Sequence, residues 1–267
     1  MRLDVLGVGL LSAGLEGWEK GREVLAGARL FCSDSVPDPE AALLPANERR
    51  RSTAGVRWAV HVAQEAMMQS RLDPRDVATV FASSGGEMGV LDQLCRALTT
   101  NERIISPTLF HHSVHNAAAG YWGIATSCQQ SSTALSCYDD SSAAGLLEAA
   151  TYATVEDCPV LFVSYDLPAP DPLIRARPIQ AAFATALVLR ASTTDGTSAS
   201  ATITLAAAEC GEVTGMPDSE LERLRADNPS GRLLPLLRAL AGTGPRTVRM
   251  NILGDQRLVV EVDPCRA

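Results

Sequence analysis

The apolar residues of this chain occur in short continuous runs and in longer stretches with helical spacing. The run at 3–11 is long and apolar enough to predict a buried first strand. The glycines at 7 and 9 within it predict a turn toward a helix around 15–25. At 53–69 the apolar side chains recur every three or four positions, which predicts a helix. Buried strands are also predicted at the short apolar runs 77–82 and 160–164, and further strands are predicted at 133–136 and 181–189.

Breakers and polar segments divide these runs. Proline-rich stretches at 33–50 and 168–178 predict surface loops, and a Ser/Thr-rich stretch at 192–202 predicts a boundary. The other expected elements are helices at 88–98, 115–124, 138–153 and 233–240, a strand at 203–207, and a β-hairpin over 247–262 that turns at Gly254-Asp255. Because strands and helices alternate, we expect an α/β layered fold.

The composition limits the kind of partner that this chain can have. It has 267 residues, 46% of them apolar, and a net charge of −8. An acidic chain lacks a broad basic face, which argues against nucleic acid or an anionic membrane as the partner. No run reaches the roughly 18 apolar residues of a membrane helix. The start also lacks a cleavage signature, so we expect a cytoplasmic protein.

We expect neither a metal nor a cofactor. The seven cysteines are scattered and never form a CxxC pair, and the four histidines have no metal-ligand spacing either. Gly7-Val8-Gly9 begins like a dinucleotide fingerprint, but Ser12 stands where the third glycine belongs. The cysteines are therefore interpreted as reduced thiols.

Six segments, taken in chain order, carry a resemblance to one known family. They are LGVGLLSAGLEGWEKGREVLAG, RRRSTAGVRWAVHVAQEAM, VATVFASSGGEMGVL, SPTLFHHSVHNAAAGYWGI, PIQAAFATALVL and VRMNILGDQRLVVEV. The fourth is the most specific, since it combines a Ser-Pro start with an Asn-x-x-Ala-Gly helix. In this order they resemble the β-ketoacyl synthase family of the thiolase fold, from its opening strand to its last hairpin.

The resemblance implies a layered α/β/α fold with a mixed sheet and a strongly abbreviated carboxy-terminal half. Its main part covers residues 1–190, which we expect to form a domain like the family's amino-terminal half. Residues 191–267 are expected to be a reduced carboxy-terminal segment of strand, helix and hairpin, packed on the same core.

The resemblance also gives a position for the family's catalytic cysteine. Family members place it at the tip between a strand and a helix, where the helix amino-terminus lowers the pKa of the thiol. An ungapped count forward from Asn116 puts Asp139 at this position. A carboxylate would form a mixed anhydride that is more reactive than a thioester, so we do not expect Asp139 to act as a nucleophile. It is either a helix cap or a charge that holds neighbouring loops shut.

Two further observations bear on catalysis. Cys137 is a rival nucleophile. Aligning it with the family's catalytic cysteine requires a two-residue deletion, which must be compensated before Gly145. A small buried cysteine without a catalytic role is the commoner case. The family also uses histidines from its carboxy-terminal half to assist decarboxylation, whereas the last histidine here is His115. We therefore expect no catalytic residue in this chain on its own.

The stretch around the histidines is expected to line an acyl pocket or a dimer interface. By resemblance this set consists of Leu109, Phe110, His112, His115 and Asn116. Leu109 and Phe110 stand where a family side chain can limit the length of the acyl chain. Ordinary interface packing is the alternative for both.

The resemblance implies a non-catalytic subunit similar to a chain length factor. Such a subunit would pair with an active ketosynthase in chain elongation of the fatty-acid or polyketide type, as in aryl-polyene synthesis. It would shape the acyl pocket and meet the acyl carrier protein indirectly. Two alternatives stay open: an acyltransferase or thioesterase that uses Cys137, and a homodimeric scaffold that binds acyl carriers.

Overall fold

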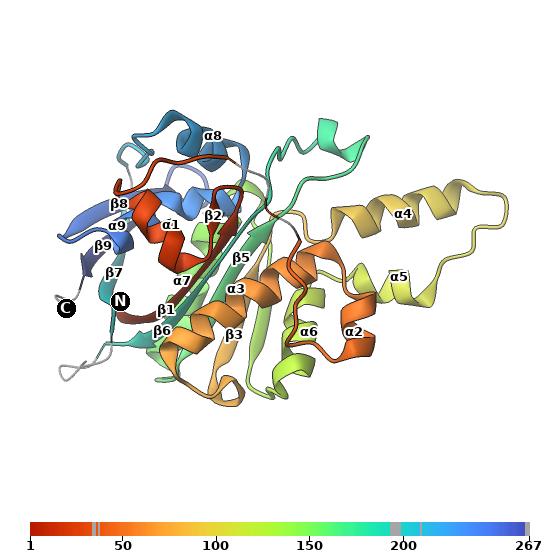
Figure 1. Ribbon diagram of the computed structural model, residues 1–267, viewed down its shortest axis with the longest axis horizontal. Helices are drawn as coiled ribbons and strands as arrows, with labels where there is room; N and C mark the ends of the chain where they lie inside the picture. Colours follow the sequence, from red (N-terminus) through yellow and green to blue (C-terminus); the bar gives the residue numbers. More distant parts are fainter. Residues whose placement is uncertain (34–35, 37, 193–198, 209, 265–267) are drawn as a thin grey trace.

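One mixed β-sheet organises the chain in the computed structural model (Figure 1). The structure describes residues 1–33, 36, 38–192, 199–208 and 210–264. The strand order is β4-β3-β5-β6-β1-β7-β9-β8, with the short β2 beside β1. β3 runs parallel to β4 and β5, and the other pairs are antiparallel. The strands are β1 (Arg2–Ser12), β2 (Leu15–Glu16), β3 (Ala78–Ala82), β4 (Ser132–Leu135), β5 (Val160–Asp166), β6 (Phe183–Ala191), β7 (Ala201–Ala208), β8 (Arg246–Asn251) and β9 (Arg257–Pro264).

Helices cover both faces of the sheet, each over its own apolar core. Successive side chains of a strand point to opposite faces, so β5 sends Phe162 into one core and Val163 into the other. The layered α/β/α arrangement is therefore confirmed. One face carries α3 (Ala54–Ser70) and α6 (Ala117–Thr126), and the other carries α1 (Trp18–Leu25), α7 (Ser141–Val155) and α9 (Leu234–Ala241). The remaining helical elements are α2 (Ala46–Arg51), α4 (Met88–Thr99), α5 (Pro107–His112), α8 (Ser219–Asp227) and the 3-10 turns η1 (Pro74–Asp76), η2 (Tyr138–Asp140), η3 (Leu173–Arg175) and η4 (Ser230–Leu233).

The glycines at 7 and 9 do not form a turn, so this part of the sequence-based prediction is wrong. Both lie inside β1, where helix α3 crosses the strand at close range. A Cβ on Gly7 would lie 2.1 Å from the Ala66 carbonyl oxygen, and one on Gly9 would lie 2.0 Å from the Val62 carbonyl oxygen. Glycine is required at both positions because the helix backbone occupies the space of a side chain.

Three helical segments differ from the sequence-based expectation. Helix α2 lies inside the stretch expected to be a loop, and the stretch after Pro107 forms two helices, α5 and α6. Helix α8 has no counterpart among the predicted elements. Its start is capped by the Asp218 carboxylate, which accepts from the backbone N–H groups of Glu220 and Leu221 at 2.9 and 3.0 Å. Only two of its residues are buried apolar side chains, so its hydrophobic pattern is weak.

The chain after β6 extends the same sheet. β1 pairs with β6 on one side and with β7 on the other, and β9 and β8 continue outward from β7. The boundary expected after residue 190 therefore falls within one continuous sheet. Residues 193–198 of the Ser/Thr-rich stretch lie outside the described residues.

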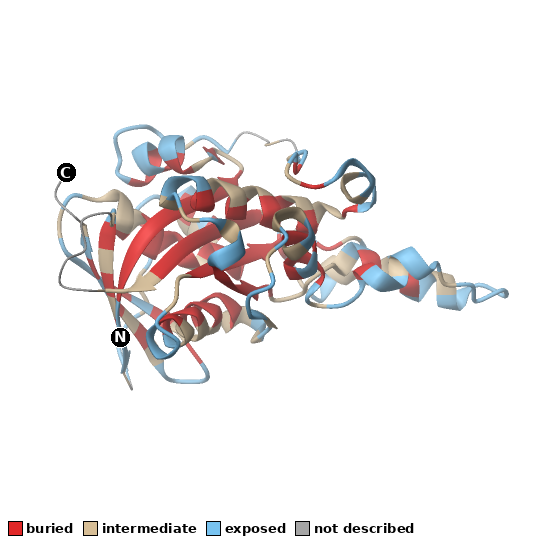
Figure 2. Cartoon of the chain, turned by 90° about the horizontal axis from the view of Figure 1, so that it is seen from below, coloured by how far each residue is buried: buried red, intermediate tan, exposed pale blue. Residues whose placement is uncertain are grey.

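Helices α4 and α5 stand away from the sheet (Figures 1 and 2). We call residues 88–114 the arm. Much of it is exposed, including the apolar side chains of Leu98, Ile104 and Phe110. In a folded protein most of the stability of a helix comes from an apolar face that packs against neighbours. The described chain therefore leaves part of the apolar surface of the arm unpacked.

Candidate functional site

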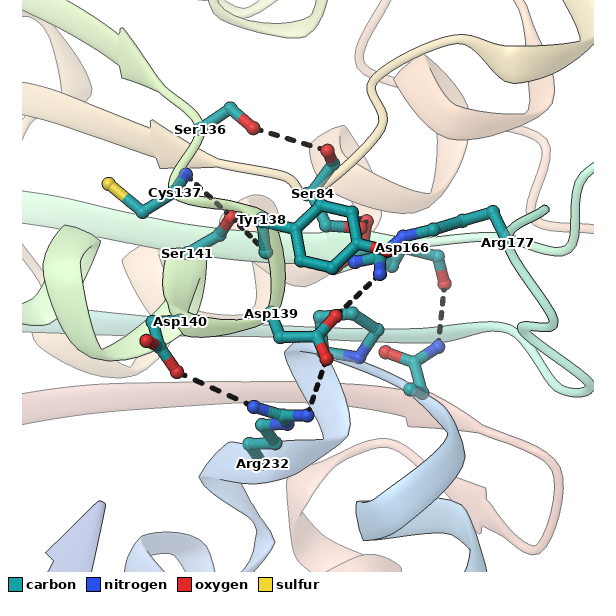
Figure 3. Close-up of polar contacts among 12 residues, drawn as sticks. Ser84, Ser136, Cys137, Tyr138, Asp139, Asp140, Ser141, Asp166, Arg177 and Arg232 are labelled. Atoms are coloured by element: carbon teal, nitrogen blue, oxygen red, sulfur yellow. Dashed lines mark hydrogen bonds and ion pairs between the residues drawn. The ribbon is translucent and has the colours of Figure 1, made fainter. Parts of the chain in front are cut away.

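Loops from three neighbouring strands meet at one edge of the sheet. β4, β3 and β5 are parallel neighbours, so their carboxyl ends lie side by side. The turn 83–87 follows β3, the turn 136–140 follows β4, and Asp166 ends β5. Arg177 and Arg232 reach these ends from two later segments (Figure 3). In open α/β sheets, this edge is where binding sites are usually built.

The turn between β4 and α7 is held by its own side chains. The Ser141 hydroxyl donates to the Tyr138 carbonyl oxygen at 2.6 Å and accepts from the Cys137 N–H at 2.9 Å. Tyr138 has a φ of 52°, in the left-handed region that an aromatic residue seldom adopts. A tight strand-to-helix turn of this kind presents its residues at the tip of the helix.

Asp139 is bound by two arginines from distant parts of the chain. Its Oδ1 atom lies 2.5 Å from Arg177 Nη1, and its Oδ2 atom lies 2.8 Å from Arg232 Nη2. Arg232 also contacts Asp140 at 3.4 Å. In the part of the chain that the structure describes, the hydrogen bonds of the Asp139 carboxylate thus go to guanidinium groups and not to the first N–H groups of α7. Its position links the turn to loop 167–182 and to η4.

Arg177 also stacks on the side chain next to Asp139. Its Cζ atom lies 3.8 Å from the centre of the Tyr138 ring, a cation–π geometry. Only 12% of the Arg177 side chain is exposed, whereas Tyr138 is 63% exposed. The exposed ring thus covers one face of a nearly buried guanidinium; Figure 3 shows the two side chains next to each other.

Asp166 is the buried centre of a hydroxyl network behind these charges. Its Oδ1 atom accepts from the Ser84 hydroxyl at 2.7 Å, the Ser84 N–H at 2.8 Å and the Ser83 hydroxyl at 3.1 Å. Its Oδ2 atom accepts from the Ser230 hydroxyl at 2.7 Å. Burial raises the pKa of this carboxyl, and the four hydrogen bonds oppose that rise. The network joins the ends of β3 and β5 to η4.

Asn228 ties the carboxy-terminal segment to the same edge. Its amide donates to the carbonyl oxygens of Asp166 and Ala181 at 3.0 and 2.8 Å. Its side-chain oxygen accepts from the N–H groups of Ser230 and Gly231. Because every polar atom of this buried side chain has a partner, the segment before α9 is fixed on the strand ends.

Cys137 lies in the turn but not among the charged groups. Its thiol is half-buried and points away from Asp139 and Arg177 (Figure 3). The two candidate positions, Cys137 and Asp139, therefore face different surroundings although only one residue separates them.

The residues expected at the acyl pocket or dimer interface do not form one cluster. Phe110 is 63% exposed on the arm and Leu109 beside it is half-buried. His112 is buried and stacked on Tyr121, with ring centres 5.5 Å apart, and burial lowers its pKa. The other two lie where the arm meets the sheet: Asn116 is exposed, and His115 Nε2 lies 2.9 Å from the Leu135 carbonyl oxygen.

A cavity of about 230 Å³ opens beside the charged cluster. It is lined by residues of the turn, α7, α8 and β8, with Asp139, Arg232 and Asn251 among them. The described residues hold no group of three or more His, Cys, Asp or Glu side chains placed to bind a metal ion. In the same part of the chain, no helix has both the length and the apolar character needed to cross a membrane.

The sequence-based set of candidate residues lacked Arg177, Arg232 and Asp166. Arg177 stands 38 residues after Asp139, and Arg232 stands 93 residues after it. Nothing in the local pattern around either arginine signals this contact, because it is created by the return of two loops to the strand ends. Asp166 carries one local signal: it is a charged residue at the end of a strand that is buried at every position.

Comparison with known proteins identifies the family of this chain. Residues 25–227 match the family described as beta-ketoacyl synthase, N-terminal domain. Among curated proteins the sequence finds no match. The chain belongs to the beta-ketoacyl synthase family, and the family resemblance seen in the sequence is confirmed.

Solved structures of ketosynthase assemblies share this fold. A chain from the ketosynthase ApeO in complex with its chain length factor ApeC, from Xenorhabdus doucetiae, is 23% identical, with a TM-score of 0.73. The alignment covers 97% of this chain and 99% of that one. A chain from the ishigamide ketosynthase/chain length factor is 11% identical, with a TM-score of 0.74 over 100% of both chains. A chain from AntDE:AntF, a type II PKS acyl-carrier protein in complex with its ketosynthase bound to the hexaketide, is 14% identical, with a TM-score of 0.78 over 99% of both chains. The fold is thus the thiolase-like fold of ketosynthases.

Proposed function

We propose that this chain is a non-catalytic subunit, similar to a chain length factor, that pairs with an active ketosynthase and shapes the acyl pocket. The observation that carries this proposal is the state of the strand-to-helix turn. The tip that would hold a thiol in a ketosynthase instead holds Asp139, with both carboxylate oxygens bound to guanidinium groups.

The chemistry of this turn favours a structural role. The two guanidinium contacts engage both carboxylate oxygens, so attack by either oxygen would first have to break an ion pair. The mixed anhydride formed by a carboxylate would also be more reactive than the thioester that it came from. The four histidines of the chain all lie at or before position 115, so the histidines that the family uses from its later segments would be supplied by the partner.

The partner surface is proposed to combine β4 and the arm. β4 is the last strand in the sheet order, so one of its edges is free for pairing within the described chain. Exposed large apolar side chains concentrate in the neighbouring segment: Leu91, Leu98, Ile104, Phe110, Val114 and Ile124. An open strand edge beside exposed apolar side chains is typical of a surface that another subunit covers.

Within this surface, Phe110 is the side chain proposed to reach the acyl pocket of the partner. It is 63% exposed, whereas Leu109 is half-buried and packs closer to its own chain. An aromatic side chain at the end of a tunnel sets its depth by filling volume. This subunit would then influence elongation by positioning the acyl chain and limiting the depth of its tunnel, without taking part in the chemical step.

The pathway, carrier and compartment are proposed on the same basis. Solved structures with this fold include a ketosynthase with its chain length factor and a ketosynthase with its acyl-carrier protein. We infer chain elongation of the polyketide type, for example of aryl polyenes, in the cytoplasm. The net charge of −8 disfavours direct binding of an acidic carrier, so the ketosynthase is expected to provide that docking surface.

Co-expression with candidate ketosynthases, followed by size measurement with light scattering, tests the pairing. A one-to-one complex is expected, and Ile104→Asp and Phe110→Asp should each weaken it, because a charge then enters the apolar interface. Val155→Asp is the matched control: Val155 is 72% exposed at the end of α7, outside the proposed surface. A stable homodimer that ignores every ketosynthase, or complexes that the arm substitutions leave intact, would contradict the proposal.

A further inference from the structure

One edge of the Arg177 guanidinium is buried without a partner. Nη1 binds Asp139, but neither Nε nor Nη2 has a hydrogen-bond partner among the described residues, and both atoms are shielded from solvent. Guanidinium groups are always charged at physiological pH, and buried charged donors are nearly always hydrogen-bonded in native structures. The bare edge therefore calls for an acceptor that the described chain does not supply.

The shape of this edge specifies the acceptor. Nε and Nη2 of arginine donate in parallel, which matches the two oxygens of a carboxylate or a phosphate. The chain uses the same edge in this way elsewhere. Arg75 binds the carboxylate of Asp73 in this way. Its Nε atom donates to Oδ1 at 3.0 Å and to Oδ2 at 3.1 Å, and its Nη2 atom donates to Oδ2 at 2.5 Å. Arg225 binds Glu222 through Nε and Nη2 at 2.8 and 2.5 Å.

The local charge also favours an anion. Asp139 and Asp140 together carry two negative charges, and Arg177 and Arg232 carry two positive charges, so these four groups balance. Helix α7 begins directly after them, and its fifteen residues place a partial positive charge at this end. These four groups therefore add no net negative charge that would oppose an anion, and the helix end favours one.

Tyr138 covers one face of the same guanidinium. Its ring lies 3.8 Å over the Arg177 guanidinium, yet 63% of the residue faces solvent. Its left-handed backbone conformation is unfavourable for an aromatic residue, and such conformations concentrate at functional sites. The ring can thus leave the guanidinium by side-chain rotation, without a change in the packed core.

We propose that the Nε and Nη2 groups of Arg177 bind a carboxylate or phosphate group of a small ligand, and that the Tyr138 ring covers this site when no ligand is bound. The site lies at the tip of the turn that precedes α7. It is independent of the pairing proposed above, since it needs only the described chain.

Side-chain NMR of the isolated chain tests this site. The Nε–Hε signal of Arg177, assigned by its loss in Arg177→Lys, is followed during titration with acetate and with inorganic phosphate at constant ionic strength. We expect a saturable shift of this signal with at least one of the two anions, and the more effective one identifies the ligand chemistry. In Tyr138→Ala the apparent affinity should rise about fivefold or more because the covering ring is gone, while Tyr138→Phe should behave like the parent chain.

Arg175→Lys provides the matched control. Arg175 lies in the same loop and is 78% exposed, so replacing it should leave the titration unchanged. The proposal is overturned if neither anion shifts the Arg177 signal in the parent chain or in Tyr138→Ala. It is also overturned if the shift appears only after a ketosynthase is added, since a carboxylate of the partner would then be the acceptor. Neither result would change the outcome of the co-expression and light-scattering experiment, so the failure of this site and the failure of the proposed pairing can be told apart.

Discussion

The double charge contact of Asp139 predicts a measurable coupling between distant segments. Replacing Asp139 with Ala leaves Arg177, whose side chain is 12% exposed, and Arg232, whose side chain is 25% exposed, without their carboxylate partner. Loop 167–182 and η4 then lose one of their links to the turn before α7. A double-mutant cycle of Asp139→Ala and Arg177→Ala isolates the energy of one contact.

The exposure of the two side chains sets the expected magnitude. Removing one partner of a fully buried ion pair costs roughly 3 to 5 kcal/mol, and fully exposed pairs contribute roughly 0 to 1 kcal/mol. Asp139 is 38% exposed and Arg177 is 12% exposed, so the pair lies between these limits. We expect a coupling of about 1 to 2 kcal/mol. In a chain of this size 1 kcal/mol corresponds to about 2 to 4 °C in Tm, so a loss of about 1 to 2 kcal/mol in Asp139→Ala should lower Tm by roughly 2 to 8 °C.

Urea unfolding, monitored by circular dichroism at two salt concentrations, measures the coupling. The control cycle uses Arg175 and Asp171, an ion pair in the same loop with side chains 78% and 66% exposed. This pair should show no measurable coupling at the higher salt concentration, while the Asp139 pair keeps most of its own. Equal couplings in the two cycles would refute the structural role of Asp139.

Three further predictions follow from buried features. Gly9→Ala should lower the free energy of unfolding by about 3 kcal/mol because its Cβ meets a backbone oxygen at 2.0 Å, whereas Gly89→Ala, with open space around it, should not destabilise in thermal unfolding. Burial raises the Asp166 pKa, so its stabilising contribution is complete below about pH 4 and is lost as pH rises through the folded-state pKa. Asp166→Asn should flatten this decline in urea titrations across pH, and an unchanged slope would contradict it. Cys137→Ser should leave ketosynthase-dependent condensation unchanged in product assays; loss of product would support a nucleophilic thiol.

The sequence pattern predicts the sheet strands well because they are buried on both faces. β5 is buried at every position, and β3 is as well, so their apolar runs are continuous and unambiguous. Helix α3 is equally clear from its spacing and from the Thr53 cap, whose hydroxyl accepts from the Val56 N–H. These elements carry their own local signal.

Other features depend on contacts that local patterns do not contain. The sequence pattern predicts a turn at the glycines of β1, but glycine is needed there because the backbone of α3 packs against them at Val62 and Ala66. Helix α8 is short and mostly exposed, so its apolar period is lost among polar residues. The two arginines that bind Asp139 come from loops that fold back to the strand ends. The sequence therefore predicts the turn at Asp139, but no local pattern predicts its contacts with Arg177 and Arg232.

The most direct measurement of the proposed division of labour is mass spectrometry of the reconstituted complex after exposure to an acyl-carrier thioester. If this chain only shapes the acyl pocket and positions the acyl chain, the acyl group should be found on the ketosynthase chain alone. Omitting this chain should lower the yield of elongated product or change its length. An acyl group found on this chain, at Cys137 or at any other residue, would contradict the non-catalytic role.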